Sequence, residues 1–351
     1  MKARYFSPII LFSIIVCALL SSCHDVPDYK DDPYGNFDAL ADIVADRYCY
    51  FEEKGIDWKA VCKKHREKVT PETGQVELFK IMSDLLDELQ DGHVNLSSRF
   101  STSYYRKWWS DYPQNFNLRT LQQYYLDFDY MSVSGISYKM LPDSIGYIYC
   151  PSFSNQISET SLDYIFAVLY GVEQAKGMII DIRNNGGGML TNIETLVGRF
   201  IDEEISGGYI RHKTGPGSND FSDPYEIRYK PASADHIRYL GPIIVLTNRS
   251  CYSAANNFVA VMKSLPNVRI CGSRTGGGGG LPFSSELPNG WGIRFSACPI
   301  TDADDRPTEF GIDPSPGYEV DCTEEELAKG KDAILDFAIE VYRKAFEEAE
   351  K

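Results

Sequence analysis

The chain has 351 residues, of which 43% are hydrophobic and 24% charged, and its formal net charge at pH 7 is −15. This length and composition allow one sizeable globular core with an appendage. Nucleic acid is excluded as an expected partner, because binding its phosphates calls for a surplus of Lys and Arg. The cysteines include no C-x-x-C pair, so a zinc or redox motif is unsupported.

The first residues have the pattern of an export signal. A short basic start precedes Ile9 to Leu20, a run without charge, which is shorter than the ~20 apolar residues of a membrane-spanning helix and suits the core of a signal peptide. The small residues before Cys23 resemble the lipobox of bacterial lipoproteins. That resemblance implies a signal peptide over 1–22, a lipid anchor on Cys23, a tether over 23–36 and a place in the bacterial cell envelope, facing the periplasm or on the cell surface. The alternative is an ordinary secretory signal with an incidental cysteine.

Residues 37–100 are expected to form a small N-terminal helical region. Apolar residues recur at helical spacing in three stretches before residue 90, and the third stretch is predicted to begin at Thr70-Pro71-Glu72, which is typical helix-start chemistry. The next segment, 101–143, is rich in Trp, Tyr and Phe. We interpret these rings as packing between two regions of the chain, with a sugar-binding surface as the alternative.

From residue 144 to 351 the pattern changes to strands that alternate with helices, which predicts an α/β core. Its last element is predicted to be one long helix over 324–350. The other expected strands are 145–150, 177–182, 243–246, 268–271 and 291–296, and the other expected helices are 162–172, 191–201 and 254–263.

Ser253 lies where a buried strand gives way to a helix. A serine at this point has an exposed hydroxyl beside the free N–H groups of the first helical turn, which suits a nucleophile. The alternative is a simple helix cap, a role that serine favours. Cys251 is a second, weaker candidate for the nucleophile.

Asp181 to Gly188 form a second candidate site, since a buried strand ends there in Asn-Asn-Gly-Gly-Gly. Glycines let backbone N–H groups approach a ligand closely, so the turn could hold an oxyanion. It lacks the Gly-Lys-Ser/Thr of a phosphate-binding loop and the spacing of a dinucleotide fingerprint. The alternative is a tight turn between strand and helix.

His93 and Glu309 complete the set of candidates. His93 follows a predicted helix end and a glycine, and Glu309 stands in a turn-rich segment near the end of the core. Each taken alone is more typical of a structural residue than of a catalytic one.

In this order, the four segments resemble the tail-specific or C-terminal processing peptidase family, which includes the tricorn-core enzymes. The resemblance rests on the stretches Leu89 to His93, Gly177 to Gly188, Ile243 to Asn256, Gly272 to Gly276 and Glu309 to Pro314. It implies a crotonase/ClpP-like α/β core with a small helical bundle in front, and a serine-type peptidase that acts on peptides or proteins without a metal or cofactor.

Departures from the family pattern decide which mechanism the resemblance implies. The turn that carries a lysine in the processing peptidases is Gly276 to Gly280 here, and Asn256 replaces a glutamate. A Ser–Lys pair is therefore not expected, whereas the Ser, His and Glu of the tricorn-like members have counterparts in this chain. Gly92 stands where tricorn has a helper serine before its histidine. The stretch between His93 and the core is too short for a PDZ domain.

The hypothesis is a peptidase in which Ser253 attacks, His93 accepts and returns the proton, and Glu309 orients His93. The N–H groups of Gly187 and Ala254 would hold the oxyanion. The main alternative is a non-catalytic member of the same fold that binds peptides or apolar ligands, and a third possibility is a surface glycan-binding lipoprotein. The expected partners are a peptide or protein substrate and, through Cys23, the membrane.

Overall fold

A computed structural model describes residues 28–351 of the chain. The expected signal peptide and the lipid-bearing Cys23 lie outside the described residues. Within the described part, no helix combines the length and the apolar composition that a bilayer crossing requires.

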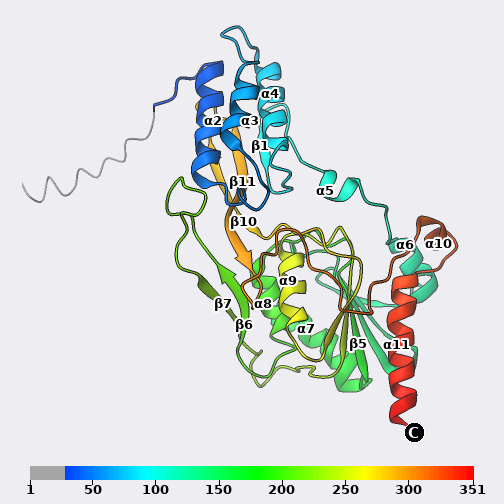
Figure 1. The fold of residues 1–351 in the computed structure, drawn as a ribbon. Helices are drawn as coiled ribbons and strands as arrows, with labels where there is room; N and C mark the ends of the chain where they lie inside the picture. The colour runs from blue at the N-terminus through cyan, green and yellow to red at the C-terminus, as the bar shows by residue number, and fades with distance from the viewer. Residues whose placement is uncertain (1–27) are drawn as a thin grey trace, which may run out of the picture.

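The core is built on a six-stranded sheet in the order β2-β3-β4-β5-β8-β9 (Figure 1). Neighbouring strands from β4 to β9 run parallel, with Ile180 opposite Ile148 on one side and Val245 on the other. This arrangement confirms the predicted α/β core. The strands are β2 (Met131–Val133), β3 (Ile136–Leu141), β4 (Ile145–Tyr149), β5 (Gly177–Asp181), β8 (Ile243–Thr247) and β9 (Val268–Gly272).

Helices cover both faces of this sheet, and alternate residues of each strand supply the two cores. Ile180 and Val245 belong to one apolar cluster, together with residues of three helices, and Ile179 and Leu246 belong to the other, together with residues of the C-terminal helix. The helices of the first face are α7 (Glu159–Phe166, continued by η3, Ala167–Val172), α8 (Leu190–Val197) and α9 (Ala254–Lys263). Those of the second are α6 (Leu118–Thr120, continued by η1, Leu121–Tyr125), α10 (Glu324–Ala328) and α11 (Ala333–Ala349).

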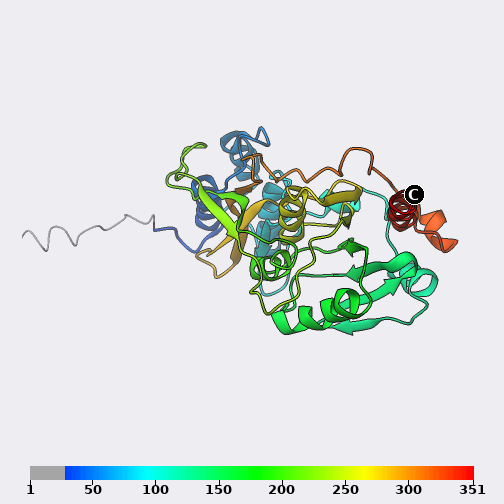
Figure 2. The same ribbon diagram turned by 90° about the horizontal axis from the view of Figure 1, so that it is seen from below.

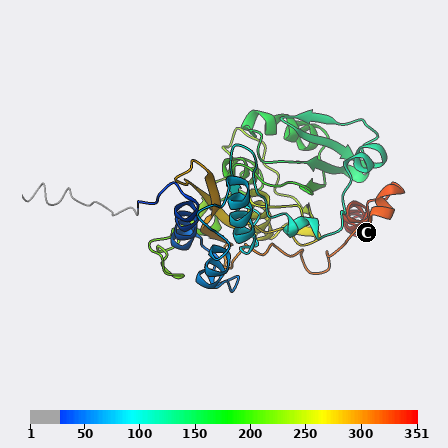
Figure 3. The ribbon, with the colours of Figure 1, turned by 90° about the horizontal axis from the view of Figure 1, so that it is seen from above.

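The N-terminal bundle forms a separate apolar cluster and stands at the opposite end of the molecule from α11 (Figures 1 and 3). Its helices are α2 (Pro33–Arg47), α3 (Trp58–Arg66) and α4 (Gln75–Asp87). They pack on a second sheet in the order β1-β11-β6-β7, with β10 also paired to β11. Its strands are β1 (Asn95–Ser97), β6 (Ile205–Ile210), β7 (Tyr225–Tyr229), β10 (Gly280–Glu286) and β11 (Gly292–Thr301).

Strand β11 links the bundle to β6, because its residues Ile293 and Phe295 lie in the apolar cluster of the bundle and its Ile300 pairs with Ile210. The aromatic segment between the bundle and the core holds the short helix α5 (Lys107–Ser110), α6 and the β2–β3 hairpin, as Figure 2 shows from below. No PDZ domain lies between His93 and the core, as the sequence predicts.

Several element boundaries differ from the sequence prediction. The first helix already begins at Pro33, inside the expected tether, since Asp32 caps it. Residues 70–73 form a turn closed by the Thr73 hydroxyl, so the third helix starts only at Gln75. The expected long C-terminal helix is broken, because Gly330 adopts a positive φ of 83° and the Asp332 carboxylate caps a new helix through Leu335 N–H.

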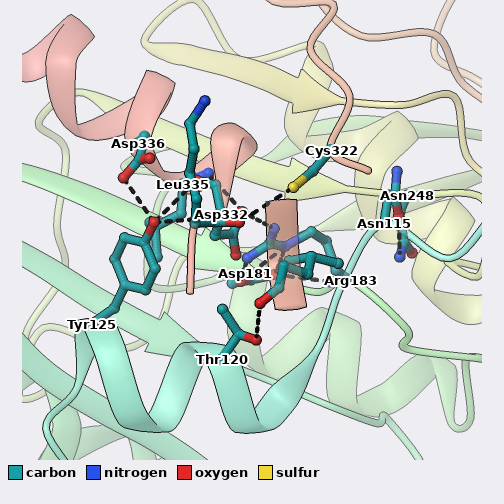
Figure 4. Close-up of polar contacts among 12 residues, drawn as sticks. Asn115, Thr120, Tyr125, Asp181, Arg183, Asn248, Cys322, Asp332, Leu335 and Asp336 are labelled. Carbon is teal, nitrogen blue, oxygen red and sulfur yellow. Dashed lines mark hydrogen bonds and ion pairs between the residues drawn. The ribbon is translucent and has the colours of Figure 1, made fainter. Parts of the chain in front are cut away.

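A fully buried ion cluster fixes the C-terminal helix to the end of β5 (Figure 4). The Arg183 guanidinium donates to Asp181 over 2.6 Å and to Asp332 over 2.7 Å. Arg183 lies two positions after the end of β5 and precedes the glycine-rich turn, so this cluster sets where that turn leaves the sheet. The turns after β5 and β8 then meet at the carboxyl edge of the sheet, where α/β folds place their sites.

Candidate active site

Ser253 stands at the N-cap position of α9 in a strained backbone conformation. Its φ and ψ are 57° and −122°, a conformation that non-glycine residues rarely adopt, and its side chain makes no capping hydrogen bond to α9. Strain of this kind gathers at functional sites. It also resembles the sharp strand-to-helix turn that exposes a serine nucleophile in other hydrolases.

The Ser253 hydroxyl lies against His93. The distance from Ser253 Oγ to His93 Nε2 is 2.9 Å, within the range of a nucleophile and its base. His93 stands in the turn between α4 and β1, so the bundle supplies it while the core supplies Ser253. Burial lowers the pKa of His93 to about 4, and the charges of Arg294 and Lys54 add to that effect while Asp91 opposes it. The ring is therefore neutral at pH 7 and able to accept a proton.

Glu309 does not make the expected contact with His93. Its Oε1 lies 2.7 Å from the Lys54 ammonium, and its Oε2 accepts the Gly279 N–H over 2.9 Å. Burial and the nearby Asp91 raise the pKa of Glu309 to about 7, against the opposing effect of Lys54. The sequence places Glu309 near the site, but its carboxylate is occupied by a lysine from the bundle.

The five-glycine turn, Gly276 to Gly280, has no room for the lysine that the processing peptidases carry at this place. Gly277 has a φ of 84°, and a Cβ on it would overlap the Glu309 carbonyl oxygen. The same residue accepts the Ser253 N–H over 2.9 Å. The turn thus passes between Ser253 and Glu309 with backbone contacts on both sides, and a side chain would force the two apart.

The glycine turn after β5 lies beside Ser253. A Cβ on Gly187 would come within 2.9 Å of both Ala254 N and Ser253 Cβ, and its φ is 100°, so only glycine fits. Its N–H, however, already donates to Asn185 Oδ1 over 2.9 Å. Ala254 N–H is at the first position of α9, where an amide has no intrahelical acceptor. Of the two predicted oxyanion donors, Gly187 N–H thus has a hydrogen-bond acceptor, whereas Ala254 N–H has none inside its helix.

Cys251 is not suited to act as the nucleophile. Its thiol is fully buried and donates to the Ile182 carbonyl over 3.0 Å, and burial raises its pKa to about 12. Asn256, which replaces the family's glutamate, is also fully buried. It joins Thr275 to Thr308 by two side-chain hydrogen bonds and has a structural role.

The aromatic segment covers one side of the site. The Trp108 ring stacks on Tyr252 with centroids 4.0 Å apart, and Tyr252 in turn contacts the His93 ring. Beside this stack is a pocket of about 440 Å³, which reaches Lys54 and Glu309. The favoured interpretation of the aromatic residues, packing between the two regions, agrees with these contacts.

Sequence reasoning missed three residues around His93, namely Lys54, Asp91 and Ser296. Asp91 stands in the same short motif as His93, which could have drawn attention to it. Lys54 lies in an ordinary turn and Ser296 in a strand, and neither position carries a recognisable pattern. Among residues 28–351, no group of three or more His, Cys, Asp or Glu side chains is arranged to hold a metal ion.

Comparisons with known proteins match the two regions of the chain separately. The model of peptidase family S41 matches residues 144–316, and the model of the tricorn protease C1 domain matches residues 29–87. The first covers most of the core, including Ser253 and Glu309, and the second covers the bundle up to the end of α4. The two matches therefore correspond to the two regions that meet at the site.

Individual relatives point in the same direction. The crystal structure of a candidate peptidase from Parabacteroides merdae ATCC 43184 superposes with a TM-score of 0.83 at 46% identity, over 89% of this chain and 97% of that one. Carboxy-terminal processing protease CtpA of Bacillus subtilis is 26% identical over 50% of this chain and 35% of its own length. Tricorn protease of Thermoplasma acidophilum is also 26% identical, over 56% of this chain and 16% of its own. The chain thus spans about a third or less of these two curated relatives, and it belongs to peptidase family S41, a family of serine-type peptidases.

Proposed function

We propose that this protein hydrolyses peptide bonds by acyl transfer, with Ser253 as nucleophile and His93 as general base. The observation that carries the proposal is the 2.9 Å contact between Ser253 Oγ and His93 Nε2 across the boundary of bundle and core. A serine hydroxyl is a weak nucleophile until a base takes its proton, and a neutral imidazole at this distance can do so.

The reaction follows from the positions of the two groups. Ser253 Oγ attacks the peptide carbonyl carbon while its proton moves to His93 Nε2. The protonated ring then gives that proton to the leaving amine, which departs and leaves an acyl-enzyme. A water molecule, deprotonated by His93, hydrolyses the ester and regenerates Ser253.

The oxyanion of each tetrahedral intermediate would be held by backbone N–H groups beside Ser253. Ala254 N–H is well placed, because it opens α9 with no helical acceptor. Gly187 N–H would join it by leaving Asn185 Oδ1, its present acceptor. One such donor is typically worth ~3 kcal/mol of transition-state stabilisation.

Glu309 takes an indirect part in this proposal. It holds Lys54 at 2.7 Å, and Lys54 lies 3.8 Å from the Asp91 carboxylate beside His93. Glu309 therefore does not orient His93 directly, and its influence on the site passes through the ion pair with Lys54. Glu309→Gln is expected to slow turnover less than His93→Ala does.

A fluorophosphonate probe on the purified protein tests the nucleophile. We expect one adduct, mapped by mass spectrometry to Ser253, and none in Ser253→Ala. Ser250→Ala is the matched control, since Ser250 is in the same turn, and it should label like the wild type. Labelling and peptide hydrolysis that survive Ser253→Ala would refute the assignment.

We also propose that the protein is anchored in the bacterial cell envelope by a lipid on Cys23. The support is the apolar run that ends in Ser-Ser-Cys. Growth with an alkyne-labelled fatty acid should label the wild type and leave Cys23→Ala unlabelled. Equal labelling of the two proteins would show that the lipid is elsewhere or absent.

A further inference from the structure

The aromatic segment between the bundle and α6 reaches the site through Trp108 (Figure 1). Helix α5 has no buried residue, and most residues of 104–114 are exposed. The Trp108 ring, however, lies almost parallel to that of Tyr252, at an angle of 25° with centroids 4.0 Å apart. The backbone carbonyl of Trp108 also accepts a hydrogen bond from the Arg249 guanidinium. Trp108 therefore fastens an otherwise exposed segment beside Ser253.

Two glycines make room for the Trp108 ring. A Cβ on Gly92 would lie 2.5 Å from Trp108 Nε1 and 2.8 Å from the Tyr252 hydroxyl oxygen, and a Cβ on Gly276 would lie 2.7 Å from the Trp108 ring. The φ of Gly92 is outside the left-handed region, so its backbone would accept a side chain. What excludes a side chain at Gly92 is the space that Trp108 already fills.

Tyr252 continues the contact from Trp108 to His93. The Tyr252 and His93 rings lie with their centroids 5.0 Å apart, and the Tyr252 hydroxyl donates to Asp91 over 3.3 Å. Tyr252 also directly precedes Ser253. Tyr252 and His93 are only 6% and 4% exposed, whereas Trp108 is half-buried. Trp108 is thus the outermost of three successive rings, and it lies between the solvent and the other two.

We propose that Trp108 is a positioning residue of the active site, which keeps water away from Tyr252 and His93 and holds the Tyr252 ring against the imidazole. A flat aromatic side chain suits this role, because it fills the slot between Gly92 and Gly276 and stacks on Tyr252. The inference rests on the proposed function, because the shielding of His93 affects turnover only if His93 serves as the base.

The shielding has a consequence for the charge of His93. Burial is the largest cause that lowers its pKa to about 4. The charged and titratable groups that face the ring, from its own loop, the turn after α2, the turn before α9 and β11, are Asp91, Lys54, Tyr252 and Arg294. All of these remain when Trp108 is removed. Access of water should therefore raise the pKa of His93 toward the ordinary value of about 6.5.

Trp108→Ala tests the proposal through the pH dependence of fluorophosphonate labelling at Ser253. With a His93 pKa of about 4, the wild type should react at nearly equal rates at pH 5 and pH 8. A pKa of about 6–6.5 leaves His93 mostly protonated at pH 5, so Trp108→Ala should react about 10- to 30-fold more slowly there than at pH 8. Trp108→Phe keeps a ring and should stay close to the wild type. Tyr104→Ala is the matched control, since Tyr104 is an exposed ring of the same segment.

Gly92→Ser tests the packing from the other side. The new side chain would displace the Trp108 ring, so this variant should show the same loss of labelling at pH 5. The double variant Gly92→Ser/Trp108→Ala should be no slower than Trp108→Ala, because residues that share one space have non-additive effects. Additive effects of the two substitutions would contradict the proposal.

Nitrogen-15 NMR of histidine-labelled protein measures the titration of His93 without any turnover. The chain has five histidines, and His93→Ala assigns the relevant signals. The pKa should rise from about 4 in the wild type to about 6–6.5 in folded Trp108→Ala. An unchanged pKa in Trp108→Ala, or an equal rise in Tyr104→Ala, overturns the proposal. Failure of the proposed function would instead appear as labelling and hydrolysis that survive Ser253→Ala, with the rise in the His93 pKa still present.

Discussion

The α/β core and the N-terminal bundle hold their parts of the site by different means. The core fixes Ser253 through backbone geometry, with a strained φ of 57° and glycine turns on either side. The bundle fixes His93 through buried side chains, chiefly Asp91 and Lys54. The position of Ser253 therefore depends on the local chain, whereas that of His93 depends on charges that meet across a boundary. Substitutions in the core should therefore act through backbone geometry, and substitutions at the boundary through buried charges.

The largest effect is expected inside the core, at Arg183. Arg183→Met leaves Asp181 and Asp332 as buried carboxylates without their shared partner. Breaking a buried ion network costs about 3–5 kcal/mol. The control is Arg66→Met, which removes a half-exposed pair with Asp38 and should cost at most about 1 kcal/mol. Urea unfolding measures both, and equal losses would mean that the cluster does not hold the core.

The next largest effect is expected at the glycine turn after β5, where a substitution should lower the catalytic activity. Gly187→Ala places a methyl group within 2.9 Å of Ala254 N and Ser253 Cβ at a φ of 100°. We expect kcat/KM to fall about 100-fold or more, since the oxyanion donors and the nucleophile are displaced together. Gly186→Ala is the control, because a Cβ there meets nothing within 4 Å. Similar activities of the two variants would contradict the proposed place of the oxyanion.

At the boundary, Lys54→Met should cost about 1–3 kcal/mol of stability at pH 8 and less at pH 5.5. Lys54 lowers the pKa of Glu309, so its removal raises that pKa further above about 7. A raised carboxyl pKa costs stability once the pH exceeds the unfolded value, and protonation relieves the cost at low pH. Urea unfolding at both pH values checks this, with the exposed Lys64→Met as control. The double variant Lys54→Met/Glu309→Gln should lose the pH dependence.

The smallest expected effect is a displacement of the pH profile. His93 must be neutral to act as the base, and its pKa is lowered to about 4. Activity should therefore be flat near pH 5–7 and fall as the pH drops through about 4. Arg294→Gln removes a charge that lowers this pKa, so the acid limb should move upward. A limb near the ordinary histidine pKa of about 6.5 would mean that His93 is not buried as described.

The same contrast explains what the sequence could predict. Helix α9 begins at Ala254 and ends at Lys263, as expected, because strand, turn and helix chemistry are local in the chain. The α/β class and the family follow from such local motifs. The apolar spacing of 324–350 continues across Gly330 and therefore predicts a single helix at the end of the chain. The break depends on the positive φ of Gly330 and on the buried ion pair of Asp332 with Arg183. The spacing of apolar residues predicts neither of them.

The residues around His93 cannot be predicted from the sequence for a different reason. Lys54, Asp91 and Ser296 come from a turn, a loop and a late strand, and only folding brings them together. The family resemblance pairs Glu309 with His93, yet Glu309 contacts Lys54, which lies 255 positions earlier in the sequence. Long-range ion pairs leave no spacing pattern, so the partner of a buried acid has to be read from the fold.

We propose that a histidine from the bundle activates a serine in the core. The most direct measurement is the rate constant for fluorophosphonate labelling of Ser253 in the wild type and in His93→Ala. The two proteins are compared under conditions in which their free energies of unfolding are equal. General-base catalysis contributes about 10²- to 10⁴-fold, so labelling of His93→Ala should be slower by that factor, and the wild-type rate should fall as the pH drops through about 4. Equal labelling rates in the two folded proteins would show that His93 does not activate Ser253.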